Sequence, residues 1–499
     1  MTKKFASLLF IGVLLLGTGC DSMLQDHPID TNKSTLELSI VLGYLDYLNQ
    51  PLTTVSGKVT LCTLNGSGNP NVKVTLRGKY ENHETYTDSS GNFLFNNVRS
   101  SDYILAVLKQ GHHFQPETQT LSVGANGASN IDIETLVTWE KTIGGEGWEK
   151  AYSIKQTNDC GYVTAGYKTL NESGDLDVYV LKLDINGNTA WEHSMGSGNS
   201  DIAYDIQNTS DGGFILTGIT YSSASALGDY LIFKLDSNGN EEWNKIYGGS
   251  ERDEARSIKQ TGNGYVVTGF SESYTDDVCD IRTLLLDNNG DIIQALNFDY
   301  NVTDKSYAVE VTSDGGYVIA GSTETTSGDY DLMVFKVNST GTVLWSYISN
   351  KDKYDEAYDV EETSDGGLIV CGSSGLNSGD FWILKLTASG GLDWEQNHGD
   401  ADVDKAYSIK QTQDGGYIVC GYTYSLENVN NDMKLLKLDS LGNIEWAKTF
   451  NGKDDDNDVA RSVIQTSDGG YAITGYTSTY TNRDDIWIKK LNSTGEIIP

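Results

Sequence analysis

One short phrase recurs along the chain, and this repeat restricts the fold more than any other feature. Thr312 to Gly321 reads TSDGGYVIAG, and Thr466 to Gly475 reads TSDGGYAITG. The glycine that ends this turn occurs seven times, at spacings of 52, 51, 52, 51, 49 and 54 residues: Gly161, Gly213, Gly264, Gly316, Gly367, Gly416 and Gly470. A period near 50 residues built from short alternating strands is typical of the blades of a β-propeller.

Each copy can be divided into four strands. In the sixth copy these are Ala406–Thr412, Gly416–Thr423, Asp432–Asp439 and Ile444–Phe450. Asp-Gly and Asn-Gly between strands favour tight hairpin turns. Four such strands cannot bury both faces alone, so the copies must stack around an axis. We predict a seven-bladed propeller over residues 137–499.

The chain ends suggest how the ring closes. The last copy stops at GEIIP, with almost no fourth strand, whereas Trp139 precedes every first strand. We predict that Thr138–Ile143 pairs with the last three strands and that Trp139 is buried in that blade. The fourth-strand tryptophan recurs in six copies, at Trp139, Trp191, Trp243, Trp345, Trp394 and Trp446.

Residues 53–136 form a separate alternating segment, predicted to be a small β-sandwich. SGKVTL, TDSSGNFLFNNV and SDYILAVLKQGHHFQP resemble the carboxypeptidase regulatory-like, prealbumin-type domain. That resemblance implies a non-catalytic accessory module. The fold class is therefore all-β, a propeller preceded by a small sandwich.

The first 20 residues have the pattern of a targeting signal. MTKK is basic, FASLLFIGVLLLG is apolar, and GTGC ends at Cys20. This resembles a bacterial lipoprotein signal, which implies lipidation of Cys20 and a location at the outer membrane, surface-exposed or periplasmic. Gly17 stands where leucine is usual, and an ordinary secretory signal is the alternative. Residues 21–52 are then a tether.

Charge and cysteine usage exclude several classes. With 35 basic and 70 acidic residues the formal charge is −35, which repels nucleic acid and leaves the lipid anchor as the membrane attachment. The other five cysteines are odd in number and lack CxxC spacing, so neither a disulfide framework nor a zinc site is predicted. We expect a monomer.

The propeller repeats also resemble a family. KLDSNGNEEW, at Lys234–Trp243, is similar to repeats of secreted bacterial and archaeal β-propeller proteins and of quinoprotein-type propellers. The latter family typically has eight blades and a quinone cofactor, or acts as an outer-membrane assembly scaffold. Seven copies without an adjacent cysteine pair argue against the quinoprotein enzyme, and we expect no cofactor.

Acidic residues recur on one face of the predicted ring. One precedes each first strand, and the set should surround the channel mouth: Glu149, Asp201, Asp253, Asp304, Asp355, Asp404 and Asp458. Such a ring could hold Ca²⁺, because hard cations prefer oxygen ligands. The interpretation we favour is that each blade needs its acid to accept backbone N–H bonds.

Variable loops on the same face carry candidate ligand-binding aromatics, which could stack on sugar rings: Tyr221, Tyr274, Tyr424 and Tyr480. The alternative is a polar rim with ordinary turn tyrosines. GxSxG, HExxH and phosphate-binding motifs are missing from the sequence. The favoured function is thus a non-catalytic lipoprotein that binds a glycan or protein. The alternatives are a carbohydrate-active hydrolase with a site at the channel mouth and a periplasmic assembly scaffold.

Overall fold

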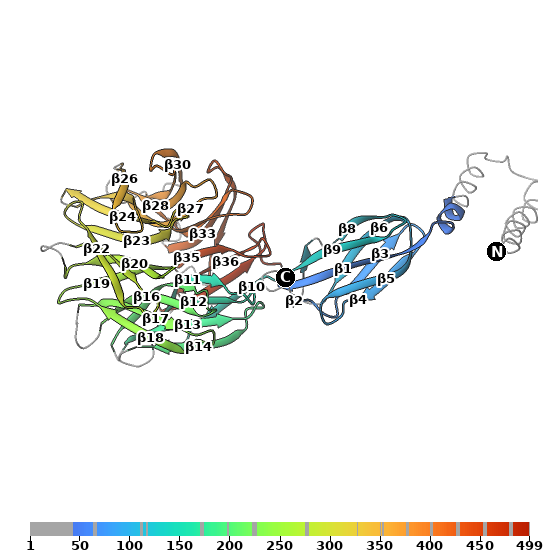
Figure 1. Ribbon diagram of the computed structural model, residues 1–499, viewed down its shortest axis with the longest axis horizontal. Coiled ribbons are helices and arrows are strands. Elements are labelled where there is room, and N and C mark those ends of the chain that lie inside the picture. The colour runs from blue at the N-terminus through green and yellow to red at the C-terminus, as the bar shows by residue number, and fades with distance from the viewer. Residues whose placement is uncertain are drawn as a thin grey trace, which may run out of the picture. The chain divides into compact units, whose positions relative to one another are not determined.

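The computed structural model describes residues 43–498 except 63–66, 110–112, 116–117, 170–173, 197–198, 222–226, 275–278, 327, 350, 352–353, 376–378, 400–402, 426–429, 453–456 and 479–482 (Figure 1). The chain folds into two compact units. The first ends at Ile133, and the main part of the second runs from Glu134 to Pro499. Among the described residues, no helix is long and apolar enough to cross a membrane. Cys20 lies outside the described residues.

The first unit is a β-sandwich. One sheet has the order β2-β1-β9-β7, with β5 also paired to β1, and the other has the order β4-β3-β6-β8. Alternating side chains such as Val74, Leu76, Phe93 and Phe95 fill the space between the sheets. The strands are β1 (Leu52–Cys62), β2 (Ser67–Gly68), β3 (Lys73–Gly78), β4 (Asn82–Tyr86), β5 (Asn92–Arg99), β6 (Ser101–Leu108), β7 (His113–Gln115), β8 (Thr118–Val123) and β9 (Ala128–Leu136).

The second unit is a seven-bladed β-propeller, in which each blade is a four-stranded antiparallel sheet. The first strands are β11 (Glu149–Gln156), β15 (Asp201–Asn208), β19 (Asp253–Thr261), β23 (Asp304–Val311), β27 (Glu356–Glu362), β31 (Asp404–Gln411) and β35 (Asp458–Gln465). The second strands are β12 (Tyr162–Thr169), β16 (Phe214–Thr220), β20 (Gly264–Ser271), β24 (Tyr317–Thr326), β28 (Leu368–Ser374), β32 (Tyr417–Ser425) and β36 (Tyr471–Ser478).

The outer half of each blade consists of a third and a fourth strand. The third strands are β13 (Leu176–Leu183), β17 (Asp229–Leu235), β21 (Asp280–Leu286), β25 (Asp329–Val337), β29 (Asp380–Leu386), β33 (Asn430–Leu438) and β37 (Asp484–Leu491). The fourth strands are β14 (Thr189–Met195), β18 (Glu241–Tyr247), β22 (Ile292–Phe298), β26 (Val343–Ser349), β30 (Leu392–His398), β34 (Ile444–Phe450) and, for the last blade, β10 (Trp139–Ile143).

Ring closure occurs as the sequence predicts. Strand β10 pairs antiparallel with β37, and Trp139 lies opposite Lys490. The indole N–H of Trp139 donates to the Ile185 carbonyl, 2.9 Å away in the first blade. Trp139 is half-buried rather than buried, because fourth strands lie at the outer edge of the propeller. The same strand thus completes the last blade and contacts the first.

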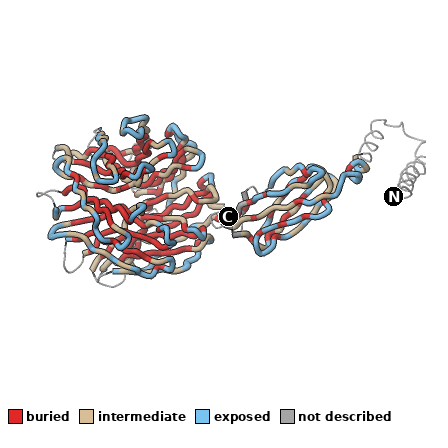
Figure 2. The backbone as a smooth tube through the Cα atoms, viewed as in Figure 1, coloured by how far each residue is buried: buried red, intermediate tan, exposed pale blue. Residues whose placement is uncertain are grey.

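Burial follows the position of each strand. The middle strands are buried on both faces because neighbouring blades cover them, as in β16 and β17. The fourth strands alternate between exposed and half-buried residues, as in β18 (Figure 2). Cys371 and Cys420 are buried in these contacts. Cys160 is disulfide-bonded, which corrects the expectation from the odd cysteine count.

Candidate binding site in the central channel

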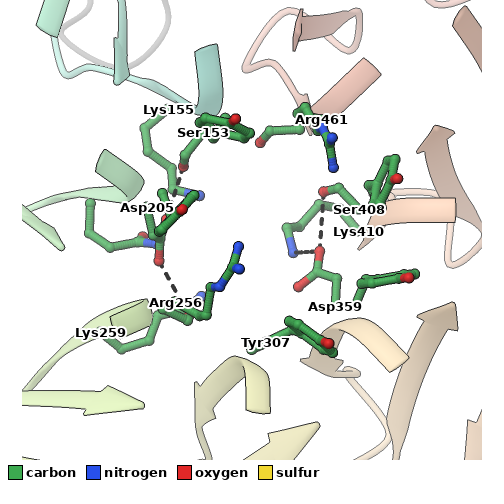
Figure 3. Close-up of a pocket in the computed structure, with 18 residues that line it drawn as sticks. Ser153, Lys155, Asp205, Arg256, Lys259, Tyr307, Asp359, Ser408, Lys410 and Arg461 are labelled. Atoms are coloured by element: carbon green, nitrogen blue, oxygen red, sulfur yellow. Dashed lines mark hydrogen bonds and ion pairs between the residues drawn. The ribbon is translucent and has the colours of Figure 1, made fainter. Parts of the chain in front are cut away.

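The channel enclosed by the seven first strands contains a cavity of about 310 Å³. Every first strand contributes side chains to its wall, which Figure 3 shows converging on a common opening. A cavity of this size lies at the lower end of the range for small-ligand sites. It is the site to which the repeat directs chemically different residues from blade to blade.

A β-bulge in each first strand directs these residues into the channel. The pairing register between first and second strands shifts at the same place in all seven blades, so that one residue of the first strand is passed over, as Tyr152 is between Ala151 and Ser153. Successive strand residues normally point to opposite faces, whereas a bulge re-aims them. Tyr152 and Ser153 therefore both line the cavity.

The recurrent glycine of the second strand follows from this bulge. Gly372 pairs with Ala357, and a Cβ on Gly372 would lie 1.9 Å from the Glu356 carbonyl oxygen. The equivalent glycines meet the equivalent carbonyl oxygen at 1.7 to 1.9 Å: Gly166, Gly218, Gly269, Gly321, Gly421 and Gly475. Only a residue without a side chain allows the two backbones to approach this closely.

The passed-over residues form a closed belt of five tyrosines and two arginines. Tyrosine rings lie next to one another at 5.3 Å for Tyr152–Tyr204, 5.3 Å for Tyr307–Tyr358 and 5.1 Å for Tyr358–Tyr407. The two arginines complete the belt. The guanidinium carbon of Arg256 lies 4.2 Å from the ring centre of Tyr204 and 5.8 Å from the ring centre of Tyr307. The guanidinium carbon of Arg461 lies 4.1 Å from the ring centre of Tyr407 and 5.5 Å from the ring centre of Tyr152. Cation–π attraction stabilises this arrangement.

Burial keeps the belt tyrosines as neutral phenols. Desolvation is the largest cause of a raised pKa at each of them: Tyr152, Tyr204, Tyr307, Tyr358 and Tyr407. The belt therefore offers aromatic surface and fixed positive charge.

The next residue of each first strand joins neighbouring blades wherever it is serine or aspartate. Asp205 Oδ2 accepts the Ile258 N–H at 3.1 Å, and Asp359 Oδ2 accepts the Ile409 N–H at 3.0 Å. Ser462 plays the same part, accepting the Ile154 N–H at 3.3 Å. The repeat thus uses this position for contacts between blades. Only two blades, those with Asp205 and Asp359, place a carboxylate there. The residues at this position, in blade order, are Ser153, Asp205, Ser257, Ala308, Asp359, Ser408 and Ser462.

Lysines occupy a deeper layer, two residues further along the strands. Lys259 Nζ lies 2.7 Å from Glu310 Oε2, and Lys410 Nζ lies 2.7 Å from Asp359 Oδ2. Burial opposes the charge of both lysines, but these carboxylates outweigh it and raise both pKa values. At Lys155 burial prevails and lowers the pKa to about 8.

The seven predicted acidic residues lie elsewhere. All are buried, at no more than 1% exposure, and none is among the residues that line the cavity. Several accept backbone N–H groups from the preceding loop, with Gly249 N 2.8 Å from Asp253 Oδ2 and Lys351 N 2.8 Å from Asp355 Oδ2. These acids stand between blades, not on the channel wall.

Five of these acids also approach a third-strand aspartate of the preceding blade: Glu149, Asp201, Asp304, Asp404 and Asp458. A side chain on Gly399 would meet Oδ1 of Asp380 at 2.1 Å and Oδ2 of Asp404 at 2.6 Å. Burial, with repulsion from Asp432 as a further cause, raises the pKa of Asp458 to about 6. Among the described residues, one group of carboxylates has the spacing of a cation site, with one oxygen from each within 4.8 Å of the others: Asp280, Asp299 and Asp304.

Of the predicted loop aromatics, Tyr221, Tyr274 and Tyr424 belong to separate blades, and none of the three lines the cavity. Tyr274 is 44% exposed, but its hydroxyl donates to the Gly248 carbonyl at 2.6 Å and the Arg282 guanidinium covers its ring at 3.6 Å. Tyr221 and Tyr424 are half-buried. Tyr480 lies outside the described residues.

Sequence reasoning missed the belt, although a signal for it exists. Aligning the copies on the first-strand acid places tyrosine three residues later in five blades and arginine in two. Alternation alone would assign this residue and the next to opposite faces, so the bulge was needed to recognise both as channel residues.

Comparisons with known proteins add the identity of the first unit. Residues 54–136 match the carboxypeptidase regulatory-like domain family. A curated relative, the regulatory protein FlaEY of Caulobacter vibrioides, is 23% identical over 206 residues, which cover 36% of this chain and 21% of that protein. The chain therefore spans about a fifth of that relative's length.

Among solved structures, the Pan2 WD40 domain of Neurospora crassa is 12% identical with a TM-score of 0.44, over 70% of this chain and 90% of that one. A protein of unknown function from Dyadobacter fermentans is 12% identical with a TM-score of 0.43, over 71% and 97%. A polysaccharide lyase of family PL25, an ulvan lyase, is 10% identical with a TM-score of 0.46, over 71% and 96%.

Proposed function

We propose that this protein is a cell-envelope lipoprotein whose propeller binds a glycan in its central channel without catalysing a reaction. The observation that carries the proposal is the closed belt of five tyrosines and two arginines around the cavity. Tyrosine combines aromatic surface with a polar group, which suits a ligand that has both apolar ring faces and hydroxyls. Serines on the adjacent layer add hydrogen-bonding groups.

A glycan fits this cavity better than a protein surface does. The cavity of about 310 Å³ is enclosed by strands of all seven blades, and protein interfaces need a broad accessible surface. Its wall is rich in hydroxyl, carboxylate, ammonium and guanidinium groups, which can form many directed hydrogen bonds. We therefore favour a small sugar or the end of a chain.

A hydrolase is the second candidate, because Asp205 and Asp359 are carboxylates that break the repeat inside one cavity. Their surroundings favour structural roles. Burial opposes ionisation of Asp359, but Lys410 and the Ile409 N–H outweigh it and hold its pKa below the usual range. A general acid in glycoside hydrolysis needs a raised pKa instead.

Binding to a glycan array tests the proposal, with a hydrolase screen on the same sample. Tyr407→Ala should weaken binding to any glycan by at least about tenfold, as expected for a central aromatic contact. Tyr274→Ala is the matched control, because it removes a tyrosine from the outer loops. If Tyr274→Ala abolishes binding and Tyr407→Ala does not, the site lies on the loops. Turnover that disappears in Asp205→Asn or Asp359→Asn would establish the hydrolase.

The lipoprotein part of the proposal rests on the sequence pattern before Cys20. Cys20→Ala removes the sulfur that would carry the lipid, so the protein should move from the membrane fraction to the soluble fraction. Fractionation of the cells that produce it, followed by immunoblotting, measures this. A variant that stays with the membranes as the wild type does would contradict lipidation.

A further inference from the structure

The wall of the channel carries more cationic than acidic side chains, although the molecule is acidic. The chain carries a formal charge of −35, yet the cavity is lined by five cationic side chains and only two carboxylates. Because a concave, partly desolvated site concentrates its field, a lining cation that no carboxylate neutralises attracts an anion even in an acidic protein. The cationic residues are Lys155, Arg256, Lys259, Lys410 and Arg461.

Three of these cations are already neutralised by the protein. Lys259 pairs with Glu310, and Lys410 pairs with Asp359. The Arg256 guanidinium contacts the fully buried Glu254. These side chains therefore hold the channel together and have little charge to offer a ligand.

The other two cations have no such partner within the described part of the chain. No carboxylate lies within 4.0 Å of the Lys155 ammonium or the Arg461 guanidinium in that part, and Arg461 Nε is buried without a hydrogen-bond acceptor. The two residues lie on neighbouring strands, β11 and β35, joined by the Ile154 N–H bond to Ser462. Figure 3 shows the Arg461 guanidinium directed into the opening from one side and Lys155 on the other, nearer to Asp205.

We propose that the channel binds an acidic sugar, with Arg461 holding its carboxylate, the charge of Lys155 adding to the attraction, and the tyrosine belt contacting its ring. This inference rests on the proposed glycan-binding function and adds the charge of the ligand. A guanidinium supplies several hydrogen-bond donors in the fork geometry that fits a carboxylate. A partly buried cation without a carboxylate partner is costly, and an anionic ligand relieves that cost.

Proton linkage gives a second signature of the same site. The Lys155 ammonium is desolvated and faces like charges on Lys259 and Lys410, whereas Asp205 and Asp359 partly offset them. With a pKa of about 8, part of the Lys155 population is neutral at pH 8. An anion beside Lys155 raises that pKa, so binding at pH 8 takes up protons and weakens as the pH rises further.

Isothermal titration calorimetry of the full chain tests the inference with glucuronate and galacturonate against the neutral sugars glucose and galactose. At least one acid should bind at least about tenfold more tightly than its neutral parent, with proton uptake at pH 8 in buffers of different ionisation enthalpy. Lys155→Gln and Arg461→Gln should each remove most of that preference. Lys448→Gln, on outer strand β34, is the charge-matched control and should bind as the wild type does.

The outcomes separate this inference from the function on which it rests. Equal affinity for acidic and neutral sugars, abolished by Tyr407→Ala, would keep glycan binding and overturn the acidic ligand. Binding of neither acid would also overturn the inference, while array binding to neutral glycans would leave the proposed function intact. Inorganic sulfate that competes equally well, with no effect of Tyr407→Ala, would show an anion site without sugar recognition and overturn it as well.

Discussion

Single residues in this protein are explained by contacts with the backbone of the neighbouring strand. The bulge that turns a tyrosine or arginine into the channel brings the backbone carbonyl of residue 356 against Gly372, and similar contacts occur in every blade. The phrase that repeats along the sequence therefore ends in glycine because the bulge requires it. The belt of tyrosines and arginines and the recurrent glycine of the second strand therefore have one physical cause, the bulge in the first strand.

Replacement of one of these glycines should destabilise the propeller. Gly372→Ala places a Cβ against the Glu356 carbonyl oxygen, and we expect a loss of at least about 2 kcal/mol in the free energy of unfolding, measured by denaturant titration. Gly262→Ala is the control, since a Cβ there meets no atom within 4 Å. Equal stability of the two variants would contradict the bulge account.

The acids between blades give a pH dependence of defined sign. Burial raises the pKa of Asp458 from 3.8 to about 6, so its contribution to stability is present below the unfolded value and is lost as the pH rises through 6. Relative to Asp458→Asn, the wild type should therefore lose on the order of 1–3 kcal/mol between pH 4 and pH 7. Thermal unfolding of both proteins across this range measures it.

A control with the opposite shift checks the sign. Hydrogen bonds from Asn443 hold the pKa of the turn residue Asp439 below its usual value. Relative to Asp439→Asn, the wild type should therefore show no such loss between pH 4 and pH 7. A wild-type protein that gains stability over Asp458→Asn as the pH rises would contradict the account.

One strand pair of the propeller, β10 and β37, joins segments that are remote in sequence. Strand β10 belongs to the last blade through β37 and contacts the first blade through Trp139. This closure covers edges that would otherwise be exposed in the first and last blades. Its residues come from the segment that follows the carboxypeptidase regulatory-like domain.

Truncation of the closing tryptophan should therefore weaken the whole ring. We expect Trp139→Ala to cost about 2–3 kcal/mol of unfolding free energy, somewhat less than a fully buried tryptophan, because the side chain is half-buried. Trp148→Ala, which removes a 51% exposed side chain, is the control. If the two variants melt alike, another part of the chain closes the ring.

The sequence was sufficient for the blades and insufficient for the site. Recurrent turns and tryptophans predicted the period, the four strands and the closure by residues 138–143, because these depend on local patterns. Alternation could not predict that Tyr152 and Ser153 face the same cavity, because a bulge suspends alternation. Nor could it show that no carboxylate of the described residues lies within 4.0 Å of the Lys155 ammonium, which depends on the side chains of the neighbouring blades.

At the scale of the whole molecule, sevenfold repetition and local exceptions have separate roles. Positions that carry a glycine or an acid in every blade maintain the ring. The channel wall differs between blades, and five tyrosines, two arginines and two carboxylates make its cavity asymmetric. Recognition is therefore expected along the axis.

A crystal structure of the full chain with a glycan that binds on the array tests this central claim most directly. We expect sugar density inside the channel, in contact with the tyrosine belt, with an acidic group within hydrogen-bonding distance of Arg461. Density on the outer strands or beside Tyr221, Tyr274 or Tyr424, with the channel free of sugar, would contradict the account.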